Sequence, residues 1–308
     1  MPKMHVSRSV VIDKKAESII EKLTHFSHWK DWSPWLLMDP KARVVISDDG
    51  RFYEWDGDRA GKGNMQIMEV RDQEYIRCDL EFLKPWRSKA EVYFHLHAKG
   101  EGSTEVTWEM DSAIPFFFFF MKKQMEAYVG MDYLRGLLML KDYCETEAVP
   151  SKLEFPGVTD VEEFAYVGIR TSCNSKELSK QMSDDLAAVE TFVQDMEEGA
   201  SGNPFSIYHT WDMVNDRIEY TSAFPVEIVP SRLPEGFVSG IIPELKAQAV
   251  QHKGPYRHLG NAWSCLYNMK QKKEFKWRKG IDPFEVYDTQ PGQVPDEELQ
   301  TTVYFPIK

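Results

Sequence analysis

The second half of the sequence contains one pattern of residues twice. Pro204, Phe205, Tyr208 and Thr210 recur as Pro283, Phe284, Tyr287 and Thr289, and the ending Phe224-Pro225-Val226 recurs as Phe305-Pro306-Ile307. The copies lie 79 residues apart at the start (204 to 283) and 81 apart at the end (224 to 305). A duplicated unit pairs with itself across an approximate twofold axis, and the groove between its copies suits a small molecule. We therefore expect the functional site in that groove.

Composition excludes several classes of function. The chain has 308 residues, of which 42% are apolar and 28% charged, enough for two domains with separate cores. Its net charge of -12 disfavours a nucleic-acid partner, because binding to phosphates needs a basic face. The sequence shows neither a signal peptide nor an apolar run of membrane-spanning length. We expect a cytoplasmic protein with a small-molecule partner and leave the oligomeric state open.

Metal and cofactor sites are not indicated. Cys78, Cys144, Cys173 and Cys265 are scattered without a CxxC spacing, so reduced thiols are expected. His95 and His97 form an HxH pair, but no third ligand accompanies them. The sequence also lacks a phosphate loop and a dinucleotide fingerprint. We therefore predict that the protein has no metal and no cofactor.

The first half reads as an antiparallel sheet followed by a long helix. A strand at 3–12 and a helix at 16–23 precede five strand-like runs at 52–55, 64–70, 75–82, 90–98 and 104–110. Apolar residues spaced by three and four then predict a helix over 117–144. A curved sheet wrapped on one long helix forms a cup, which favours an apolar ligand.

The order of several motifs in this half carries a family resemblance. The tryptophan-rich run 26–35 is followed by Tyr53, Trp55 and Gly57, then by Glu81 and Phe82, then by Thr104, Val106 and Trp108, and finally by Arg135, Gly136 and Leu137. Residues 1–148 thus resemble the polyketide-cyclase-like branch of the START-like (SRPBCC) helix-grip proteins. The resemblance implies an apolar cavity, for which the tryptophans, Trp86 among them, are candidates. We assign its lining to Trp32, Trp55, Phe82 and Trp108.

The second half reads as two copies of strand, helix, strand and strand. The first copy is predicted at 163–170, 175–197, 205–210 and 218–226. The second has a strand at 247–251, a helix that begins just after Tyr256, and strands at 284–289 and 300–307. Residues 149–156 are predicted to be a linker, and the proline-rich stretch 229–243 joins the copies.

A more specific resemblance covers the repeat. It lies in the run His252-Lys253-Gly254-Pro255-Tyr256, in Ala262 and Trp263, in Phe284, Glu285 and Tyr287, and in Leu299, Thr301, Tyr304 and Pro306. Residues 156–308 resemble the GyrI-like effector-binding domain, which is also attached to AraC-type regulators. The resemblance implies binding of diverse, often cationic or aromatic, small molecules between two halves, and in some members hydrolysis of cyclopropane-bearing toxins. No helix-turn-helix pattern precedes it, so the regulator role is not expected.

These observations predict an α+β protein with two domains. Residues 1–148 form the helix-grip domain, 149–156 the linker, and 157–308 the pseudo-twofold β-α-β-β effector-binding domain. Within the repeat, alternation places Glu285 and Tyr287 on one side of their strand. If the opposite, apolar side packs on the helices, the carboxylate and the phenol point into the groove. The predicted ligand-binding residues are Tyr208, Trp211, Tyr256, Trp263, Glu285 and Tyr287.

The predicted site leaves two functions open. A carboxylate among aromatic rings suits an amphipathic cation, which favours a sensor or carrier. The alternative is a hydrolase in which Glu285 is the general base and Tyr287 or Tyr208 donates the proton. A third possibility, cyclase chemistry in the first domain, lacks a clear acid–base pair. Thr302 stands where the family commonly has an acidic residue, which leaves Glu285 as the main charged candidate.

Overall fold

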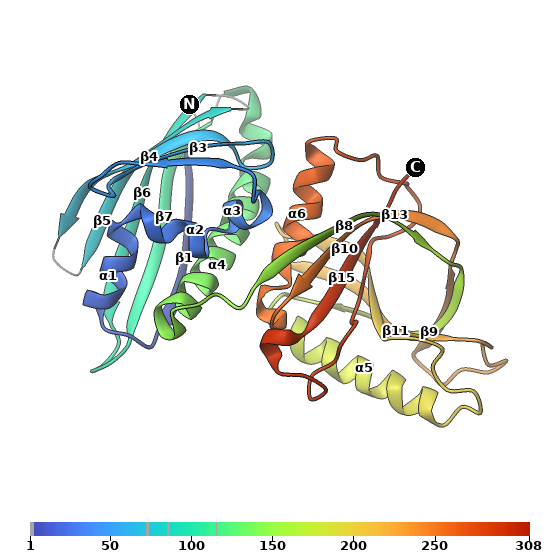
Figure 1. Ribbon diagram of the computed structural model, residues 1–308. Coiled ribbons are helices and arrows are strands. Elements are labelled where there is room, and N and C mark those ends of the chain that lie inside the picture. The colour runs from blue at the N-terminus through green and yellow to red at the C-terminus, as the bar shows by residue number, and fades with distance from the viewer. Residues whose placement is uncertain (1–2, 72–73, 85–86, 115) are drawn as a thin grey trace. The chain divides into compact units, whose positions relative to one another are not determined.

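The computed structural model describes residues 3–71, 74–84, 87–114 and 116–308, with the side chains of 116–118 excepted. The chain divides into two compact units, Met1–Ser151 and Lys152–Lys308 (Figure 1). Trp86, a candidate for the first cavity, lies outside the described residues. Both units are built on large antiparallel sheets, so the fold is of the α+β class.

The first unit contains a seven-stranded antiparallel sheet in the order β1-β7-β6-β5-β4-β3-β2. Five of the six strands after β1 match the strand-like runs of the sequence. The short β2 was not predicted, because its four residues give too little alternation to detect. The strands are β1 (Lys3–Ile12), β2 (Arg43–Ile46), β3 (Phe52–Gly57), β4 (Gly61–Arg71), β5 (Tyr75–Lys84), β6 (Ser88–Ala98) and β7 (Thr104–Ala113).

The long helix of this unit starts later than the apolar pattern predicted. The α-helix α4 covers Lys122–Thr146, and Phe116–Met121 forms a 3-10 helix before it. Consecutive aromatic side chains lose rotamer freedom in an α-helix, and tighter 3-10 turns are common at helix ends. Three short α-helices lie between β1 and β2, namely α1 (Ala16–Thr24), α2 (Trp29–Trp32) and α3 (Pro34–Met38), and a 3-10 helix covers Phe26–His28.

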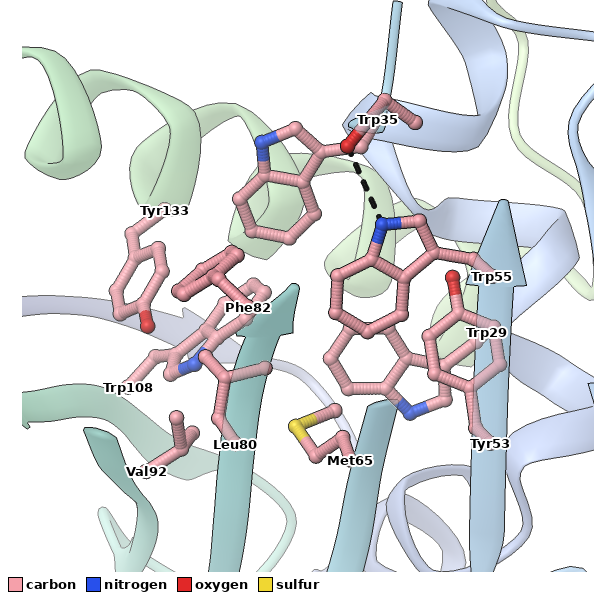
Figure 2. Close-up of a pocket in the computed structure, with 11 residues that line it drawn as sticks. Trp29, Trp35, Tyr53, Trp55, Met65, Leu80, Phe82, Val92, Trp108 and Tyr133 are labelled. Carbon is pink, nitrogen blue, oxygen red and sulfur yellow. Dashed lines mark hydrogen bonds between the residues drawn. The ribbon is translucent and has the colours of Figure 1, made fainter. Parts of the chain in front are cut away.

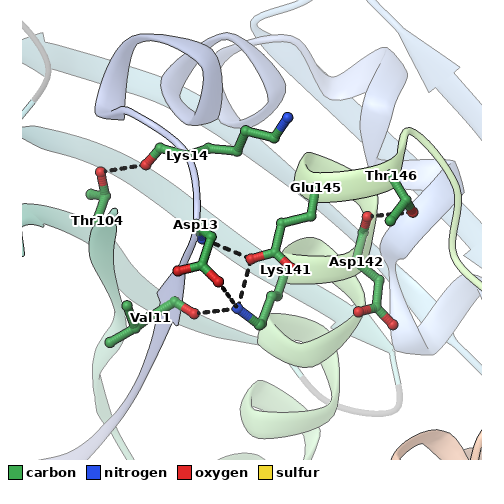
Figure 3. A network of polar contacts seen from close by, with 8 residues as sticks. All are labelled: Val11, Asp13, Lys14, Thr104, Lys141, Asp142, Glu145 and Thr146. Carbon is green, nitrogen blue, oxygen red and sulfur yellow. Dashed lines mark hydrogen bonds and ion pairs between the residues drawn. The ribbon is translucent and has the colours of Figure 1, made fainter. Parts of the chain in front are cut away.

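A polar network fastens α4 to the end of β1 (Figure 3). The Nζ of Lys141 donates to the carbonyl of Val11 at 2.8 Å and to Oε1 of Glu145 at 2.6 Å. The same carboxylate oxygen accepts the backbone N–H of Asp13 at 2.7 Å. These contacts satisfy backbone groups where β1 ends and fix the helix against the sheet. The core then forms from the inward face of the sheet and from α4 residues such as Leu137.

The second unit is an eight-stranded antiparallel sheet in the order β12-β9-β11-β10-β14-β15-β13-β8. Helix α5 (Leu178–Gln194) packs on β9 and β11, and α6 (Gly260–Gln271) packs on β13 and β15. The strands are β8 (Lys152–Val161), β9 (Phe164–Cys173), β10 (Phe205–Asp212), β11 (Arg217–Val226), β12 (Phe237–Ile242), β13 (Leu245–Lys253), β14 (Phe284–Val286) and β15 (Gln300–Pro306). Short 3-10 helices cover Tyr256–His258 and Asp296–Glu298.

The approximate twofold axis passes between β10 and β14, the inner strands of the two copies. The backbone N–H of Tyr208 donates to the carbonyl of Pro283, and the N–H of Tyr287 donates to the carbonyl of Pro204, both at 3.0 Å. Each residue in this reciprocal pair of hydrogen bonds has its equivalent in the other copy. The duplication in the sequence is therefore a duplication in space.

Each copy has one strand more than the sequence predicted. β8 begins inside the stretch 149–156 expected to be a linker, and β12 lies inside the proline-rich stretch 229–243. Both are outermost strands, where proline is tolerated, and β8 itself contains Pro156. The outer strands are also exchanged: β8 pairs with β13 of the second copy, and β12 pairs with β9 of the first.

Candidate ligand-binding sites

A buried carboxylate lies at the centre of the second sheet. Glu285 belongs to the short strand β14 and is 1% exposed. Its Oε1 accepts hydrogen bonds from the hydroxyls of Tyr287 at 2.8 Å and Tyr208 at 3.0 Å. Its Oε2 accepts the indole N–H of Trp263 at 2.5 Å. Four residues that the sequence predicted for the site are thus brought into one hydrogen-bonded cluster.

The cluster faces the helices, which reverses one premise of the sequence argument. The alternate residue Phe284 packs on the other face, in a core with Phe205 and Leu245. Glu285 instead points toward α5 and α6, since Trp263 belongs to α6. The apolar side of β14 packs against other strands of the same curved sheet. The alternation of residues in β14 alone could not predict this arrangement. The acidic side still lies where the two repeats meet.

Burial controls the protonation of this carboxylate. Desolvation raises the pKa of Glu285, and the hydrogen bonds from Trp263, Tyr287 and Tyr208 partly offset that rise because they stabilise the charged form. Among the described residues, no lysine or arginine forms an ion pair with Glu285. Burial and the neighbouring carboxylate also raise the pKa values of Tyr208 and Tyr287 well above the usual range. Both phenols therefore keep their protons and serve as donors.

The cluster ends at a serine and a thioether. The hydroxyl of Ser206 lies 2.9 Å from that of Tyr287, and Ser206 is fully buried. The sulfur of Met182, on α5, lies 3.2 Å from the Tyr287 hydroxyl and 3.9 Å from the Tyr208 hydroxyl. Met182 was not predicted as a site residue. In the sequence, its spacing of four from Leu178 and from Leu186 is typical of a core position on a helix.

A separate cavity of about 100 Å³ lies in the first unit (Figure 2). Among the predicted residues, Trp55, Phe82 and Trp108 line this cavity, but Trp32 does not. The Trp32 ring is fully buried behind the wall, 4.6 Å from the Trp29 ring and 5.7 Å from the Trp108 ring between centroids. The aromatic lining residues are Trp29, Trp35, Tyr53, Trp55, Phe82, Trp108 and Tyr133.

Two local features hold the Trp55 ring at the wall of this cavity. The indole N–H of Trp55 donates to the carbonyl of Ala60 at 3.2 Å, as Figure 2 shows. Gly63, on the neighbouring strand, leaves room for the ring, because a Cβ there would lie 2.5 Å from it. Tyr53, which is on β3 like Trp55, stacks on the Trp55 ring with 5.2 Å between ring centroids. A residue without a side chain is therefore needed opposite Trp55, where Gly63 pairs with it.

Comparison with known proteins separates the two units. The family model described as "GyrI-like small molecule binding domain" matches residues 156–308. Residues 156–308 are a GyrI-like domain. No curated protein matches the sequence. The GyrI-like domain is the unit that holds Glu285 and its three hydrogen-bond partners.

Solved structures of low sequence identity resemble parts of the chain. The EcmrR–DNA complex shares 17% identity, covers 61% of this chain and 68% of its own, and has a TM-score of 0.41. A START superfamily protein from Mycobacterium smegmatis shares 16% sequence identity with a TM-score of 0.34. The match covers 47% of this chain and 99% of that protein. SAV2435 bound to tetraphenylphosphonium shares 13% sequence identity with a TM-score of 0.38. The match covers 50% of this chain and 94% of SAV2435.

The other predicted site residues of the GyrI-like domain lie around the cluster. The Trp211 ring is 5.5 Å from the Tyr208 ring, and the Tyr256 ring is 5.6 Å from the Tyr287 ring between centroids. Neither residue has a hydrogen bond to Glu285 among the described contacts. Tyr256 is 36% exposed, and burial raises its pKa to about 12. The rings of Trp211 and Tyr256 thus lie outside the two tyrosines that hydrogen-bond Glu285.

Thr221 and Thr302, which are 81 residues apart and thus equivalent in the two copies, lie on the face of the sheet away from Glu285. The hydroxyl of Thr302 donates to Asp288 at 2.6 Å, and Thr221 lies 2.8 Å from Nε2 of His209. The residue at position 302 therefore does not approach the buried carboxylate in this chain. Within the described ranges, no cluster of three or more His, Cys, Asp or Glu side chains could hold a metal ion. No helix of the described part is long and apolar enough to cross a membrane.

Proposed function

We propose that the GyrI-like domain binds an aromatic or amphipathic cation at Glu285, and that the protein acts in the cytoplasm as a sensor or carrier of that molecule. The supporting observation is the buried carboxylate, which has donors on both oxygens but no basic partner among the described residues. Burying an unpaired charge is costly, and a protein commonly neutralises it by proton uptake or by a counter-charge. A cationic ligand supplies the counter-charge.

The walls of the site suit the apolar part of such a ligand. Tyr208 and Trp263 meet edge to face, with 4.7 Å between ring centroids, and Tyr287 continues the aromatic surface toward Tyr256. An aromatic ring attracts a desolvated cation by about 0.5 to 2 kcal/mol. The rings therefore add affinity for a delocalised cation, while the single carboxylate selects for charge.

The decisive experiment compares a cation with a neutral molecule of similar shape. Tetraphenylphosphonium and triphenylphosphine oxide would be titrated calorimetrically into the wild type and into Glu285→Gln. We expect about a tenfold loss of affinity for the cation in the variant, and little change for the neutral molecule. Asp288→Asn is the matched control, because it removes a carboxylate from the opposite face of the same sheet. Equal losses for both molecules would contradict the role of charge.

The same geometry supports hydrolysis as a second candidate. Glu285 has two phenols at 2.8 and 3.0 Å, so a base and two proton donors already lie within hydrogen-bond reach of one another. In that function Glu285 would activate water and Tyr287 or Tyr208 would donate the proton to the leaving group. The protein would be incubated with a cyclopropane-bearing electrophile and the products followed by mass spectrometry. Recovery of unchanged electrophile would exclude this candidate.

The cavity of the first unit is proposed as a second, apolar binding site. Its volume of about 100 Å³ is smaller than the cavity of about 150 Å³ that holds benzene in an engineered protein. A ligand held wholly inside is therefore no larger than a single ring. The lining contains no carboxylate, histidine or lysine among the described residues, so the cavity offers no acid–base pair for cyclase chemistry.

A further inference from the structure

The ligand site at Glu285 is closed in this structure. The carboxylate is 1% exposed, and Tyr287, Tyr208 and Trp263 are each buried around it. A ligand can reach the carboxylate only after a wall residue moves. Three of the walls hydrogen-bond Glu285 directly, and breaking a hydrogen bond to a buried charged group costs more than breaking one between neutral groups. These three walls are held in place.

The fourth wall, Met182, is held less firmly. Its sulfur lies near the hydroxyls of Tyr287 and Tyr208, but each phenol has a single proton, and both phenols already lie within hydrogen-bond distance of Glu285. The carboxylate is the stronger acceptor, so the thioether is held mainly by packing. Met182 is also half-buried rather than fully buried. Its unbranched side chain has several rotatable bonds, so withdrawing it breaks no strong hydrogen bond.

The pseudo-twofold axis shows why this wall differs from the one opposite. Met182 on α5 and Trp263 on α6 are 81 residues apart, the same interval that separates the endings of the two copies. Trp263 donates its indole N–H to Glu285, whereas the equivalent of Glu285 in the first copy is Ser206. The first copy has no carboxylate at this position, and the thioether of Met182 has no proton to donate, so Met182 makes no counterpart of the Trp263–Glu285 hydrogen bond. Helix α6 therefore contributes a wall residue fixed by a hydrogen bond, Trp263, and helix α5 contributes one that can move, Met182.

We propose that Met182 is the movable cover of the ligand site, and that the apolar body of the ligand displaces its side chain to reach Glu285. The proposal rests on ligand binding at Glu285, as argued above. It makes Met182 the residue that sets the size of the accepted ligand. Moving Met182 also consumes part of the binding free energy. The observed affinity is therefore the affinity of the open form multiplied by the fraction of molecules in which Met182 is withdrawn.

The test measures tetraphenylphosphonium affinity in a series of variants at position 182. Met182→Ala removes the cover, and we expect it to bind about tenfold more tightly than the wild type. Met182→Leu keeps the volume and should stay within about twofold of the wild type, whereas Met182→Trp should lose about tenfold or more. Leu186→Ala is the matched control, because it truncates an apolar residue of the same helix that packs against the core cluster of Val189 and Val193. It should not tighten binding.

The outcomes separate this proposal from the one on which it rests. If Glu285→Gln weakens binding but Met182→Ala leaves it unchanged or weakens it, the carboxylate site stands and the cover is refuted. If Met182→Ala and Leu186→Ala tighten binding equally, general loosening of α5 is the cause, and the cover is again refuted. If neither the wild type nor Met182→Ala binds the cation, both proposals fall. A tighter Met182→Ala that still depends on Glu285 supports both.

Discussion

Ser206 and Glu285 face each other across the central pair of strands, β10 and β14, at equivalent positions of the two repeats. Both side chains are buried. The hydroxyl of Tyr287 donates to the carboxylate of Glu285 and lies within hydrogen-bond distance of the hydroxyl of Ser206. The approximate symmetry of the domain is therefore broken at its axis by one carboxylate. That break places a single carboxyl group where the equivalent positions meet.

Restoring the symmetry should destabilise the protein. Ser206→Glu would bury a second carboxylate beside Glu285, and two close like charges cannot both ionise without a large cost. We expect a loss of about 3 kcal/mol in the free energy of unfolding at pH 7, measured by denaturant titration, and a smaller loss near pH 4. Ser206→Gln has nearly the same volume without the charge. If its loss equals that of Ser206→Glu at both pH values, charge is not the cause.

Cation binding should strengthen as pH rises. Burial raises the pKa of Glu285, so between the usual pKa of 4.5 and the raised value the free protein keeps the carboxyl proton that a cation must displace. Affinity for tetraphenylphosphonium should increase through that window and then level off. The titrations would run from about pH 5 to about pH 8. A slope that persists in Glu285→Gln would show that another group is responsible.

The raised pKa of Glu285 also affects stability. A raised pKa means that the folded state binds the proton more tightly, so the contribution of Glu285 to stability is complete below pH 4.5 and is lost as pH rises through the folded pKa. A bound cation reverses this trend. The pH dependence of unfolding should therefore be weaker at saturating tetraphenylphosphonium than without it.

A buried histidine should make the protein sensitive to acid. His252 on β13 is fully buried, and burial together with the neighbouring His258 lowers its pKa from 6.5 to about 3. For a depressed pKa the stability is present above pH 6.5 and is lost as pH falls toward 3. Between pH 7 and pH 5 the loss amounts to about 2 kcal/mol. In His252→Gln this part of the pH dependence should vanish, as urea titrations at the two pH values would show.

The cavity of the first unit depends on Gly63. A Cβ at this position would lie 2.5 Å from the Trp55 ring and 2.6 Å from the carbonyl of Glu81, so Gly63→Ala should displace the ring and strain the strand pair. We expect a loss of about 1 to 3 kcal/mol in the free energy of unfolding. Gly102→Ala is the control, because a Cβ there meets open space. Similar stability of both variants would contradict the close packing at Trp55.

Sequence reasoning located the central cluster because the duplication supplied a frame of comparison. Tyr208 and Tyr287 are equivalent residues of the two copies, and Glu285 stands where the first copy has Ser206. Met182 escaped notice, because a methionine at helical spacing gives the same signal whether it packs in a core or covers a site. Trp32 was misplaced for the related reason that an aromatic-rich loop does not show which rings reach the cavity.

The missed strands have a different physical cause. β2 is short, and β8 and β12 are outermost strands, with proline in or next to the β8 and β12 segments. Their pairing is decided by distant strands rather than by their own alternation, since β8 pairs with β13 and β12 with β9. Local patterns predict strands that bury one whole face. They do not predict strands recruited by the remote half of the chain.

The exchange of these outer strands gives the domain the topology of a dimer whose two subunits have been joined into one chain. In a true homodimer every position at the axis occurs twice, so an acid there would always meet its own copy. Joining the halves lets a single mutation affect one side only. Glu285 and Ser206 show the result: a site with one charge and two matching tyrosines, which identical subunits could not have produced.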